Sequence, residues 1–346
     1  MTGPLALPLA LLGPPAGIYG ILIRLRNEIY DRSWGTTRAG VPVISVGNLT
    51  VGGTGKTPLV AWIARLILSE GFRPAVVSRG YRGSAGRGPL LVSEGSGPLV
   101  GPGVAGDEPY LLARTLPEIR VVVGSDRVAG AQEAHRAGAE VVILDDGFQH
   151  RRLARDLDIV LLDAEEPFGN FRLLPAGPLR EPLRALARAD IIVITRWHHG
   201  QSVGELQRSV RRHNSRCLIA RAVVHRVGFV DPTGNPIPAP RKALAFCGIG
   251  NPRGFRSDLE AEGLDLVGFR AFADHHPYSI TEMRALTEEA RRLEVALVTT
   301  EKDLVRLPIA AGRGSPRLAA LRIESRIEDG ETVRAAVRAM LRRASA

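Results

Sequence analysis

The chain has 346 residues, of which 45% are hydrophobic and only 5% aromatic, and it carries a net charge of +10. This length and apolar content are sufficient for two ordinary domains with proper cores. The two cysteines, Cys217 and Cys247, lie far apart, which excludes a disulfide framework or zinc site and fits a reducing cytosol. The charge favours anionic partners, or reflects a general arginine bias; aromatic and basic residues do not interleave, so we expect no nucleic-acid partner.

Residues 4–23 form an uncharged apolar stretch that is followed by Arg24 and Arg26. A secretory signal carries its positive charge before the apolar run, so this order argues against one. Pro14 and Pro15, together with nearby glycines, are expected to break the segment and prevent a membrane-spanning helix. We therefore expect residues 1–35 to be an apolar membrane-interface segment, with an N-terminal helix packed on the protein as the alternative.

From residue 41 onwards, short apolar strands alternate with helical patterns. Apolar runs without alternation, separated by helices, indicate a parallel sheet covered on both faces. This pattern predicts a P-loop NTPase-type α/β domain over residues 36–215. Its expected strands lie at residues 42–46, 120–124, 141–146, 159–163 and 191–195, and residues 74–83 are expected to be a further strand that leads into a basic, glycine-rich loop.

A second, smaller α/β domain is predicted for residues 216–346, closing over the site of the first. Residues 218–224 are expected to form a linking strand, and residues 243–250 restart the α/β pattern. Ser279 and Glu282 have the spacing of a capping box, which predicts the start of a helix that reaches Leu293. Another buried strand is expected at residues 295–300.

The segment TVGGTGKT follows the first strand and precedes a helix, which is the context of a phosphate-binding loop. Thr50 stands where the general pattern has its first glycine, but the three glycines leave the backbone free to curl around phosphates. Lys56 is expected to reach the β- and γ-phosphates of ATP, and the Thr57 hydroxyl to bind Mg²⁺. The nucleotide-binding residues are then Thr50, Val51, Gly52, Gly53, Thr54, Gly55, Lys56 and Thr57.

Carboxylates and an arginine follow other strands. Asp145 and Asp146, in LDDGFQH, end an apolar strand as Walker B carboxylates do, which predicts that at least one serves the metal. The alternative is a turn capped by one of them. Arg127, just past a strand end, would clamp phosphate or pair with a neighbouring carboxylate.

Two further motifs carry titratable residues. In GDEPYLL, Asp107 or Glu108 caps a helix, or Asp107 accepts a proton from an attacking hydroxyl; the spacing does not decide between these roles. In DHHPY, two histidines beside Asp274 suggest the second half of a site. The sequence by itself does not distinguish His275 from His276.

In chain order, the motifs are SVGNLTVGGTGKTP, SRGYRG, GDEPYLLA, VGSDR, ILDDGFQH, LLPAGPLREP and DHHPY. Together they resemble the tetraacyldisaccharide 4′-kinases, the lipid A 4′-kinases of Gram-negative bacteria, over residues 40–300. The resemblance implies transfer of the γ-phosphoryl group of ATP, with Mg²⁺, to the 4′-hydroxyl of an anionic glycolipid, tetraacyldisaccharide 1-phosphate. It also implies peripheral association with the cytoplasmic face of the bacterial inner membrane. We expect a monomer.

The resemblance assigns roles to individual residues. Asp107 and His275 take the positions of the family's catalytic acid–base pair, in which Asp107 accepts the proton of the 4′-hydroxyl. Because His275 lies in the second domain, both domains must close around ATP before the pair can work. The remaining implied residues are Lys56 and Arg127 for catalysis, Gln149 and His150 beside the nucleotide, and Thr57, Asp145 and Asp146 for the metal.

An anionic lipid as acceptor is consistent with the positive charge and the apolar start of the chain. The loop at residues 168–182 is a basic loop for such a substrate, or a long surface connection. Arginines in and after it are expected to face lipid phosphate or anionic membrane, where each charge contributes about 1 kcal/mol. They are Arg172, Arg180, Arg184 and Arg188, set against Glu181.

Other classes fit less well. A switch ATPase or GTPase acting on a protein partner is the main alternative, but Val51 stands where partitioning ATPases carry a second lysine. EKD at residues 301–303 also lacks the pattern expected for guanine recognition. A kinase of a soluble sugar would need neither the apolar start nor the positive charge.

Overall fold

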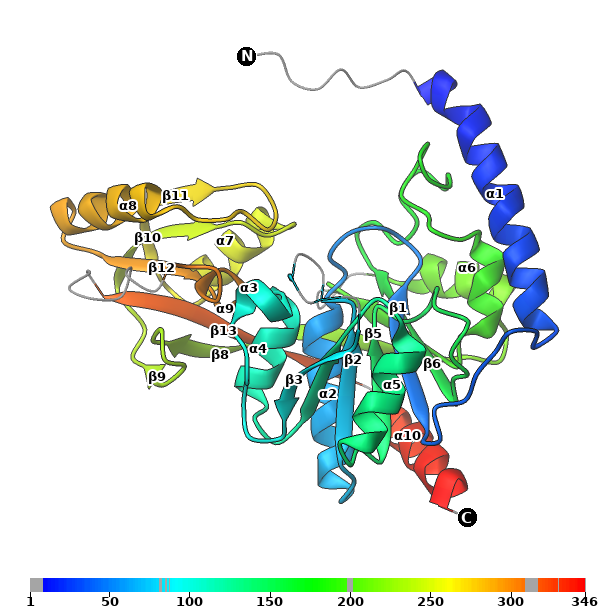
Figure 1. Ribbon diagram of the computed structural model, residues 1–346. Helices are drawn as coiled ribbons and strands as arrows, with labels where there is room; N and C mark the ends of the chain where they lie inside the picture. The colour runs from blue at the N-terminus through cyan, green and yellow to red at the C-terminus, as the bar shows by residue number, and fades with distance from the viewer. Residues whose placement is uncertain are drawn as a thin grey trace.

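The computed structural model describes residues 9–80, 83–84, 86, 88–197, 202–308, 317–328 and 330–345. Tyr81 and Arg82 of the SRGYRG motif lie outside these ranges. The thirteen described strands form one continuous sheet with helices on both faces (Figure 1). The strand order is β11-β10-β12-β13-β8-β7-β6-β1-β5-β2-β4-β3, and β9 pairs with β8 beside this path. The predicted α/β fold class is therefore confirmed.

The first block of the sheet runs from β8 to β3. All its neighbours are parallel except β3, which closes the edge antiparallel to β4. In β1, Ile44 and Val46 point into the core on one face and Val43 into the core on the other. Strands buried on both faces need continuous apolar runs, which explains the missing alternation. The strands are β1 Val43–Asn48, β2 Pro74–Ser78, β3 Leu90–Glu94, β4 Arg120–Val123, β5 Val141–Asp145, β6 Leu157–Asp163, β7 Ile191–Thr195 and β8 Leu218–Val230.

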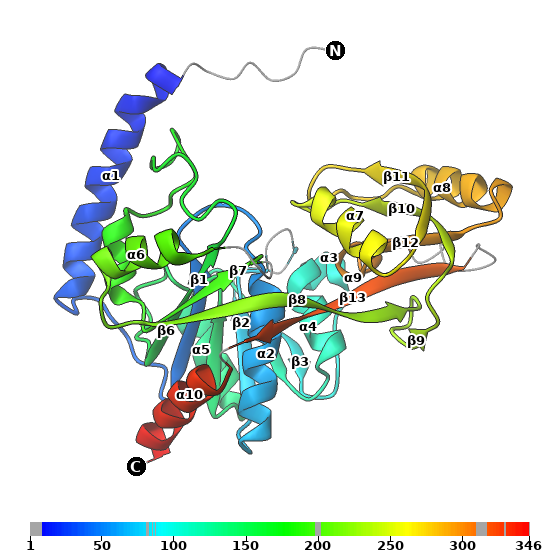
Figure 2. The same ribbon diagram turned by 180° about the vertical axis from the view of Figure 1, so that it is seen from behind.

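The second block continues the same sheet with the parallel strands β11, β10, β12 and β13. The two blocks are joined by β8 and β13, which pair antiparallel from Val230 with Ala320 to Ala222 with Ile327. Both views show these two long strands reaching from one block to the other (Figures 1 and 2). The remaining strands are β9 Pro236–Ile237, β10 Lys242–Cys247, β11 Asp265–Ala271, β12 Ala296–Thr300 and β13 Leu318–Ile327.

Helices cover both faces of each block. In the first block, α2, α4 and α10 pack on one face, and α5, η1 and α6 on the other. In the second block, α8 and α7 occupy opposite faces. The expected capping box of α8 is confirmed, with Ser279 Oγ accepting from the Glu282 N–H at 3.1 Å. The helices are α1 Leu9–Asp31, α2 Lys56–Ser69, α3 Pro102–Ala105, α4 Asp107–Thr115, α5 Arg127–Arg136, η1 Leu183–Arg188, α6 Gly204–His213, α7 Pro252–Ala261, α8 Ile280–Arg292, α9 Glu301–Leu304 and α10 Gly330–Ser345.

The expected break in the N-terminal segment is wrong. Helix α1 runs without interruption from Leu9 to Asp31, with Pro14 and Pro15 inside it. Both prolines lie near its N-terminal end, so the hydrogen bonds that they remove are lost from the first turns, and about four turns follow intact. None of the described helices has the length and apolarity needed to cross a membrane.

The division into residues 1–35, 36–215 and 216–346 stays a prediction. Two observations bear on where the units meet. Strand β8 begins beside β7 in the first block and ends in the second. Helix α10 returns to the first block, where Val333, Val337 and Leu341 join its core. The second block is thus built from the segment between β8 and β13, and both connections to it are strands of the shared sheet.

Candidate active site

The phosphate-binding loop connects the end of β1 to the start of α2. Gly52 and Gly55 have φ values of 116° and 79°, in the left-handed region that residues with side chains rarely adopt. A Cβ atom at either position would meet nothing within 4 Å, so glycine is needed here for the backbone conformation. Val51 and Gly53 are exposed as well, and the loop therefore opens to solvent as an anion-binding loop must.

Contacts from neighbouring segments fix this loop. The hydroxyl of Thr195, at the end of β7, donates to the carbonyl of Thr54 at 3.0 Å, and Arg196 donates to the carbonyl of Gly53. The N–H of Val51 donates to the carbonyl of Pro178 at 2.8 Å. Two loop carbonyls are thus bound by protein donors.

Lys56, at the first position of α2, folds back over the loop. Its Nζ lies 3.3 Å from Asn48 Oδ1, 3.5 Å from the carbonyl of Gly52 and 3.6 Å from Asp146 Oδ1. The side chain is only 14% exposed. The ammonium group therefore sits between the loop and the end of β5, where it can neutralise phosphate charge.

The two carboxylates after β5 have opposite electrostatics. Asp145 is buried; its Oδ2 accepts from Ser78 Oγ at 3.2 Å, whereas Oδ1 has no hydrogen bond in the described part of the chain. Burial, with the nearby charge of Glu108, raises the pKa of Asp145 to about 7. Burial also acts to raise the pKa of Asp146, but Lys56 and Arg180 outweigh it and bring that pKa below its ordinary value. Asp145 thus keeps an oxygen for a ligand.

Arg127, Gln149 and His150 lie around this edge of the sheet. Arg127 is buried and donates to the carbonyl of Gly124 at 2.6 Å. Burial lowers its pKa, and the charges of the two Walker carboxylates act against that change. Gln149 donates to the carbonyl of Asn48 at 3.0 Å, which braces the end of β1. Burial and the charge of Arg127 lower the pKa of His150 to about 4, so this imidazole is neutral at pH 7.

Asp107 and His275 meet across the two blocks. Asp107 begins α4, and its Oδ2 lies 3.1 Å from His275 Nδ1. The cap of α4 is Gly106, and no side chain caps the helix, so Asp107 does not act as the cap. Burial acts to raise the pKa of Asp107, but the hydrogen bond with His275 and the charge of Arg306 outweigh it and lower that pKa. The carboxyl group is therefore ionised at neutral pH.

His276 points into a different environment. Its Nε2 lies 3.0 Å from Glu282 Oε1, and its ring stacks on Phe272 with the centroids 4.7 Å apart. It belongs to the capping region of α8. Between the two histidines, only His275 contacts Asp107 within the described residues.

Arg180 and Arg188 do not face outward as expected. Arg180 Nη1 binds both oxygens of Asp146, at 2.8 and 2.9 Å, and Arg188 makes two bonds of 3.1 Å to Glu181. Glu181 is completely buried, and a buried carboxylate without a counter-charge would be costly. The guanidinium group of Arg188 therefore turns inward to neutralise it. Of the four arginines, Arg172 and Arg184 remain exposed.

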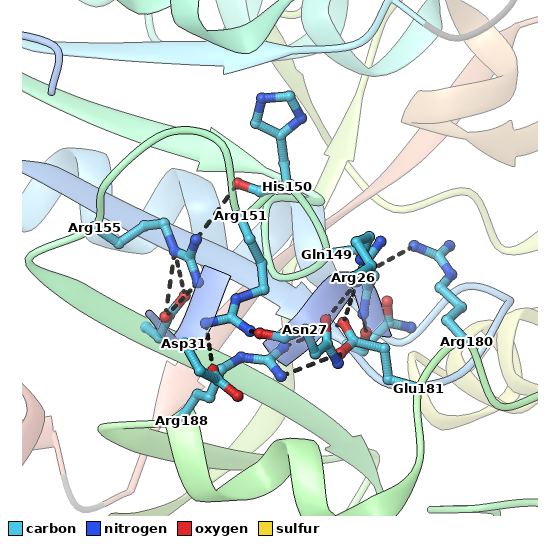
Figure 3. A network of polar contacts seen from close by, with 12 residues as sticks. Arg26, Asn27, Asp31, Gln149, His150, Arg151, Arg155, Arg180, Glu181 and Arg188 are labelled. Atoms are coloured by element: carbon cyan, nitrogen blue, oxygen red, sulfur yellow. Dashed lines mark hydrogen bonds and ion pairs between the residues drawn. The ribbon is translucent and has the colours of Figure 1, made fainter. Parts of the chain in front are cut away.

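The same network ties α1 to the catalytic edge (Figure 3). Glu181 also accepts from Asn27 Nδ2 at 2.7 Å and pairs with Arg26 at 3.4 Å. The hydroxyl of Tyr19 donates to the carbonyl of Arg180 at 2.8 Å. Polar side chains of α1 therefore face the protein and hold the segment that binds Asp146.

Comparison with known proteins places this arrangement in a family. The family model described as tetraacyldisaccharide-1-P 4′-kinase (LpxK) matches residues 8–342. The chain belongs to this family. A tetraacyldisaccharide 4′-kinase from Chlorobium luteolum is 43% identical over 310 residues, which cover 86% of each chain, and one from Geobacter sulfurreducens is 43% identical over 311 residues, covering 89% and 86%. The solved structure of Aquifex aeolicus LpxK in complex with ATP superposes with a TM-score of 0.79 at 34% identity, covering 96% of this chain and 99% of that one.

Membership confirms the resemblance inferred from the sequence, and with it the enzyme class. The chain is a kinase of the tetraacyldisaccharide 4′-kinase family, and the alternative of a switch ATPase or GTPase is not favoured. The roles assigned to single residues stay predictions.

Residues that the sequence analysis did not single out complete the contact between blocks. Lys302 Nζ lies 2.8 Å from Glu108 Oε1 and 3.4 Å from His275 Nε2. Arg306 Nε lies 2.8 Å from Asp107 Oδ2. Both cations follow β12, and a charged run just after a buried strand is a usable signal for a functional site. The guanine-recognition pattern is the wrong test for the EKD segment, because its pairing with a residue almost two hundred positions away is not visible in the local sequence.

Proposed function

We propose that this chain transfers the γ-phosphoryl group of ATP to the 4′-hydroxyl of tetraacyldisaccharide 1-phosphate. The observation that carries the proposal is the contact of Asp107 with His275 beside a complete phosphate-binding loop. Lys56 follows β1, Asp145 ends β5 and His275 follows β11, so these residues lie at the carboxyl ends of parallel strands, the usual place for a ligand site in such sheets. An acid–base pair that spans the two blocks, together with a phosphate loop in the first block, suits a two-substrate transfer.

The loop fits ATP. Its glycines give the required backbone conformation, and Thr54 Oγ1 is a buried polar atom without a partner among the described residues. Backbone N–H groups at the start of α2 would bind phosphate oxygens, and Lys56 would neutralise the β- and γ-phosphates. Gln149 braces the end of β1, from which the loop starts, and with His150 would lie beside the nucleotide, while Arg127 adds positive charge behind the Walker carboxylates.

The donor set also fits Mg²⁺ bound together with ATP. The described residues contain no cluster of three or more histidine, cysteine or acidic side chains that would hold a metal alone. Mg²⁺ in kinases is held by one or two protein oxygens together with substrate phosphates and water. Thr57 and the free Oδ1 of Asp145 would supply the protein oxygens, with Asp146 holding Lys56 and Arg180 nearby. When bound, the ion would neutralise charge on the phosphates.

Asp107 would accept the proton of the attacking hydroxyl. It is ionised at neutral pH and lies on the half-buried contact between the blocks. His275 holds its Oδ2 through Nδ1, and Lys302 Nζ lies 3.4 Å from Nε2, the other nitrogen of the imidazole. The Nδ1–H of His275 would donate to Asp107 and orient it. Both halves of the site come from one chain, which supports action as a monomer.

Helix α1 supports peripheral association with the cytoplasmic face of the bacterial inner membrane. Its polar residues Asn27 and Tyr19 face the protein, whereas a row of apolar residues faces solvent. The row comprises Ile18, Ile21, Leu22, Leu25 and Ile29, each 47–62% exposed. Trp34, 68% exposed, follows the helix, and aromatic residues of this kind favour the membrane interface. A helix with this apolar face would lie in the interface beside the anionic glycolipid.

The proposal is tested with γ-labelled ATP, Mg²⁺ and tetraacyldisaccharide 1-phosphate in detergent, by following label into the lipid. We expect Lys56→Ala to remove most transfer. Lys242→Ala is the matched control, because Lys242 begins β10, far along the strand from the end that borders the site, and among the described residues it pairs only with Asp265, in an exposed contact. ATP hydrolysis at the same rate with and without the lipid, with no label in the lipid, would instead support a switch ATPase.

A further inference from the structure

Arg306 connects the two blocks through a single guanidinium group. Its side chain is only 6% exposed. Nε lies 2.8 Å from Asp107 Oδ2 in the first block, and Nη1 lies 3.1 Å from Asp303 Oδ1 in the second. Nη1 also donates to the carbonyl of Gly248 at 2.9 Å. The cation is therefore held between one carboxylate that is proposed to act in catalysis and one that is not.

The second-block end of this connection is rigid. Asp303 is completely buried and accepts from the Gly248 N–H at 3.0 Å, the Tyr278 hydroxyl at 2.9 Å and the Thr300 hydroxyl at 2.7 Å. The carbonyl of Gly248 accepts from the N–H of His275 at 2.9 Å as well. Arg306 and His275 are thus fixed to the same point, where β10 and β12 end, and they reach Asp107 as a unit.

The two groups bind the same oxygen of Asp107. His275 Nδ1 and Arg306 Nε both contact Oδ2, whereas Oδ1 receives no hydrogen bond from any described residue. The contact of His275 is a hydrogen bond and that of Arg306 is an ion pair, and a carboxylate held at one oxygen by both has a restricted orientation, with its other oxygen presented in a defined direction.

We propose that Arg306 is a positioning residue for phosphoryl transfer, which holds Asp107 so that Oδ1 faces the acceptor hydroxyl. The inference rests on the proposed role of Asp107 as base. As the acceptor oxygen bonds to the γ-phosphorus, its proton passes to Oδ1, and the bond from the γ-phosphorus to the bridging oxygen breaks with its electrons leaving on ADP. Arg306 takes no part in these bonds. It fixes the angle at which the proton is received.

The alternative is that Arg306 only neutralises buried Asp303. Removal of the arginine alone would leave that carboxylate uncompensated, so Arg306→Met is compared with the double variant Asp303→Asn/Arg306→Met. Arg322→Met is the matched control: Arg322, on β13, binds Glu301 at the start of α9 at 2.8 Å and does not touch Asp107. Lipid transfer is measured against pH, with the melting temperature and ATP affinity of each variant.

For the double variant we expect kcat to fall by about 10²-fold while ATP affinity stays within a few fold. The acidic limb of the pH profile should move to higher pH, because loss of the cation raises the pKa of Asp107. Arg306→Lys should recover part of the rate, and Arg322→Met should resemble wild type.

Wild-type kcat and an unmoved acidic limb in the double variant would overturn the inference and leave Arg306 a structural residue. A separate measurement distinguishes this from failure of the proposed function. If Asp107→Asn is inactive while the double variant matches wild type, only the role of Arg306 is wrong. If Asp107→Asn is fully active, Asp107 is not the base, and the inference fails with it.

Discussion

Asp145 and Asp146 are neighbours in sequence, yet the fold places their carboxylates in opposite electrostatic states. Asp145 ends a buried strand and its side chain accepts one hydrogen bond from the described residues, so burial dominates and raises its pKa. Asp146 has a φ of 54°, which turns its side chain towards Lys56 and Arg180. The difference arises from backbone direction, because the turn begins between them.

This difference predicts opposite pH-dependent effects on stability. The pKa of Asp145 is raised in the folded protein, so its ionisation destabilises the fold as pH rises from the ordinary carboxyl pKa to about 7. Asp145→Asn cannot ionise and should gain stability relative to wild type at pH 8, by at most about 4 kcal/mol, with little gain at pH 4. Urea unfolding without nucleotide or Mg²⁺ at both pH values measures the effect.

Asp146→Asn is the control and should behave in the opposite way. The folded-state pKa of Asp146 is lowered, so its ionised form stabilises the fold above the ordinary carboxyl pKa, and that stability is lost as pH falls through the lowered value. The variant should lose stability at pH 8 and approach wild type in acid. The same sign for both variants at pH 8 would contradict the electrostatic assignment.

Asp107 and the two histidines give the clearest test of residue roles. We expect Asp107→Asn and His275→Asn each to lower kcat by about 10²- to 10⁴-fold, the range for loss of a positioned base, with smaller effects on ATP affinity. His276→Asn should cost far less, because His276 contacts Glu282 and not Asp107. Equal losses at both histidines would refute the assignment of His275.

At the scale of elements, α1 is amphipathic with its polar side inward. Asn27 and Arg26 bind buried Glu181, and the apolar side is left without a partner among the described residues. Burial of apolar area in a membrane interface contributes about 25 cal/mol per Å², so the proposed membrane association would give this exposed apolar row a favourable contact.

The helix makes a specific prediction about membrane binding. Leu22→Glu and Leu25→Glu change exposed positions, so they should leave the fold intact. They should reduce co-sedimentation with vesicles of anionic phospholipid several-fold, because a charged group in the interface opposes insertion of the apolar face. Ile280→Glu makes the same change at an exposed residue of α8 and should bind as wild type does. Unchanged sedimentation of the α1 variants would contradict the interfacial role.

At the scale of the whole molecule, the site depends on how the chain crosses between blocks. It leaves the first block along β8, builds the second, and returns along β13 to place α10 against the first core (Figure 2). Glu108 with Lys302 and Asp107 with His275 then span the contact. Closure of both units around ATP, which the resemblance implies, needs no new pairing at this contact, because Asp107 and His275 already meet.

Local features were predictable from the sequence, and long-range pairs were not. The strand, loop and helix around Lys56 and the capping box at Ser279 are set by residues within a few positions of one another. The inward turn of Arg180 and the pairing of Arg306 with Asp107 depend on which elements the fold brings together. Helix α1 continues through Pro14 and Pro15. A proline removes backbone hydrogen bonds locally, and the stability of the neighbouring turns decides whether the helix ends there.

The central claim is that one chain moves the γ-phosphoryl group of ATP to a defined hydroxyl of an anionic glycolipid. It is tested most directly by incubating the wild-type chain with γ-labelled ATP, Mg²⁺ and tetraacyldisaccharide 1-phosphate, and by fragmenting the product in a mass spectrometer. We expect one added labelled phosphate, on the 4′ position. Unlabelled lipid with release of inorganic phosphate, or label at another position of the lipid, would contradict it.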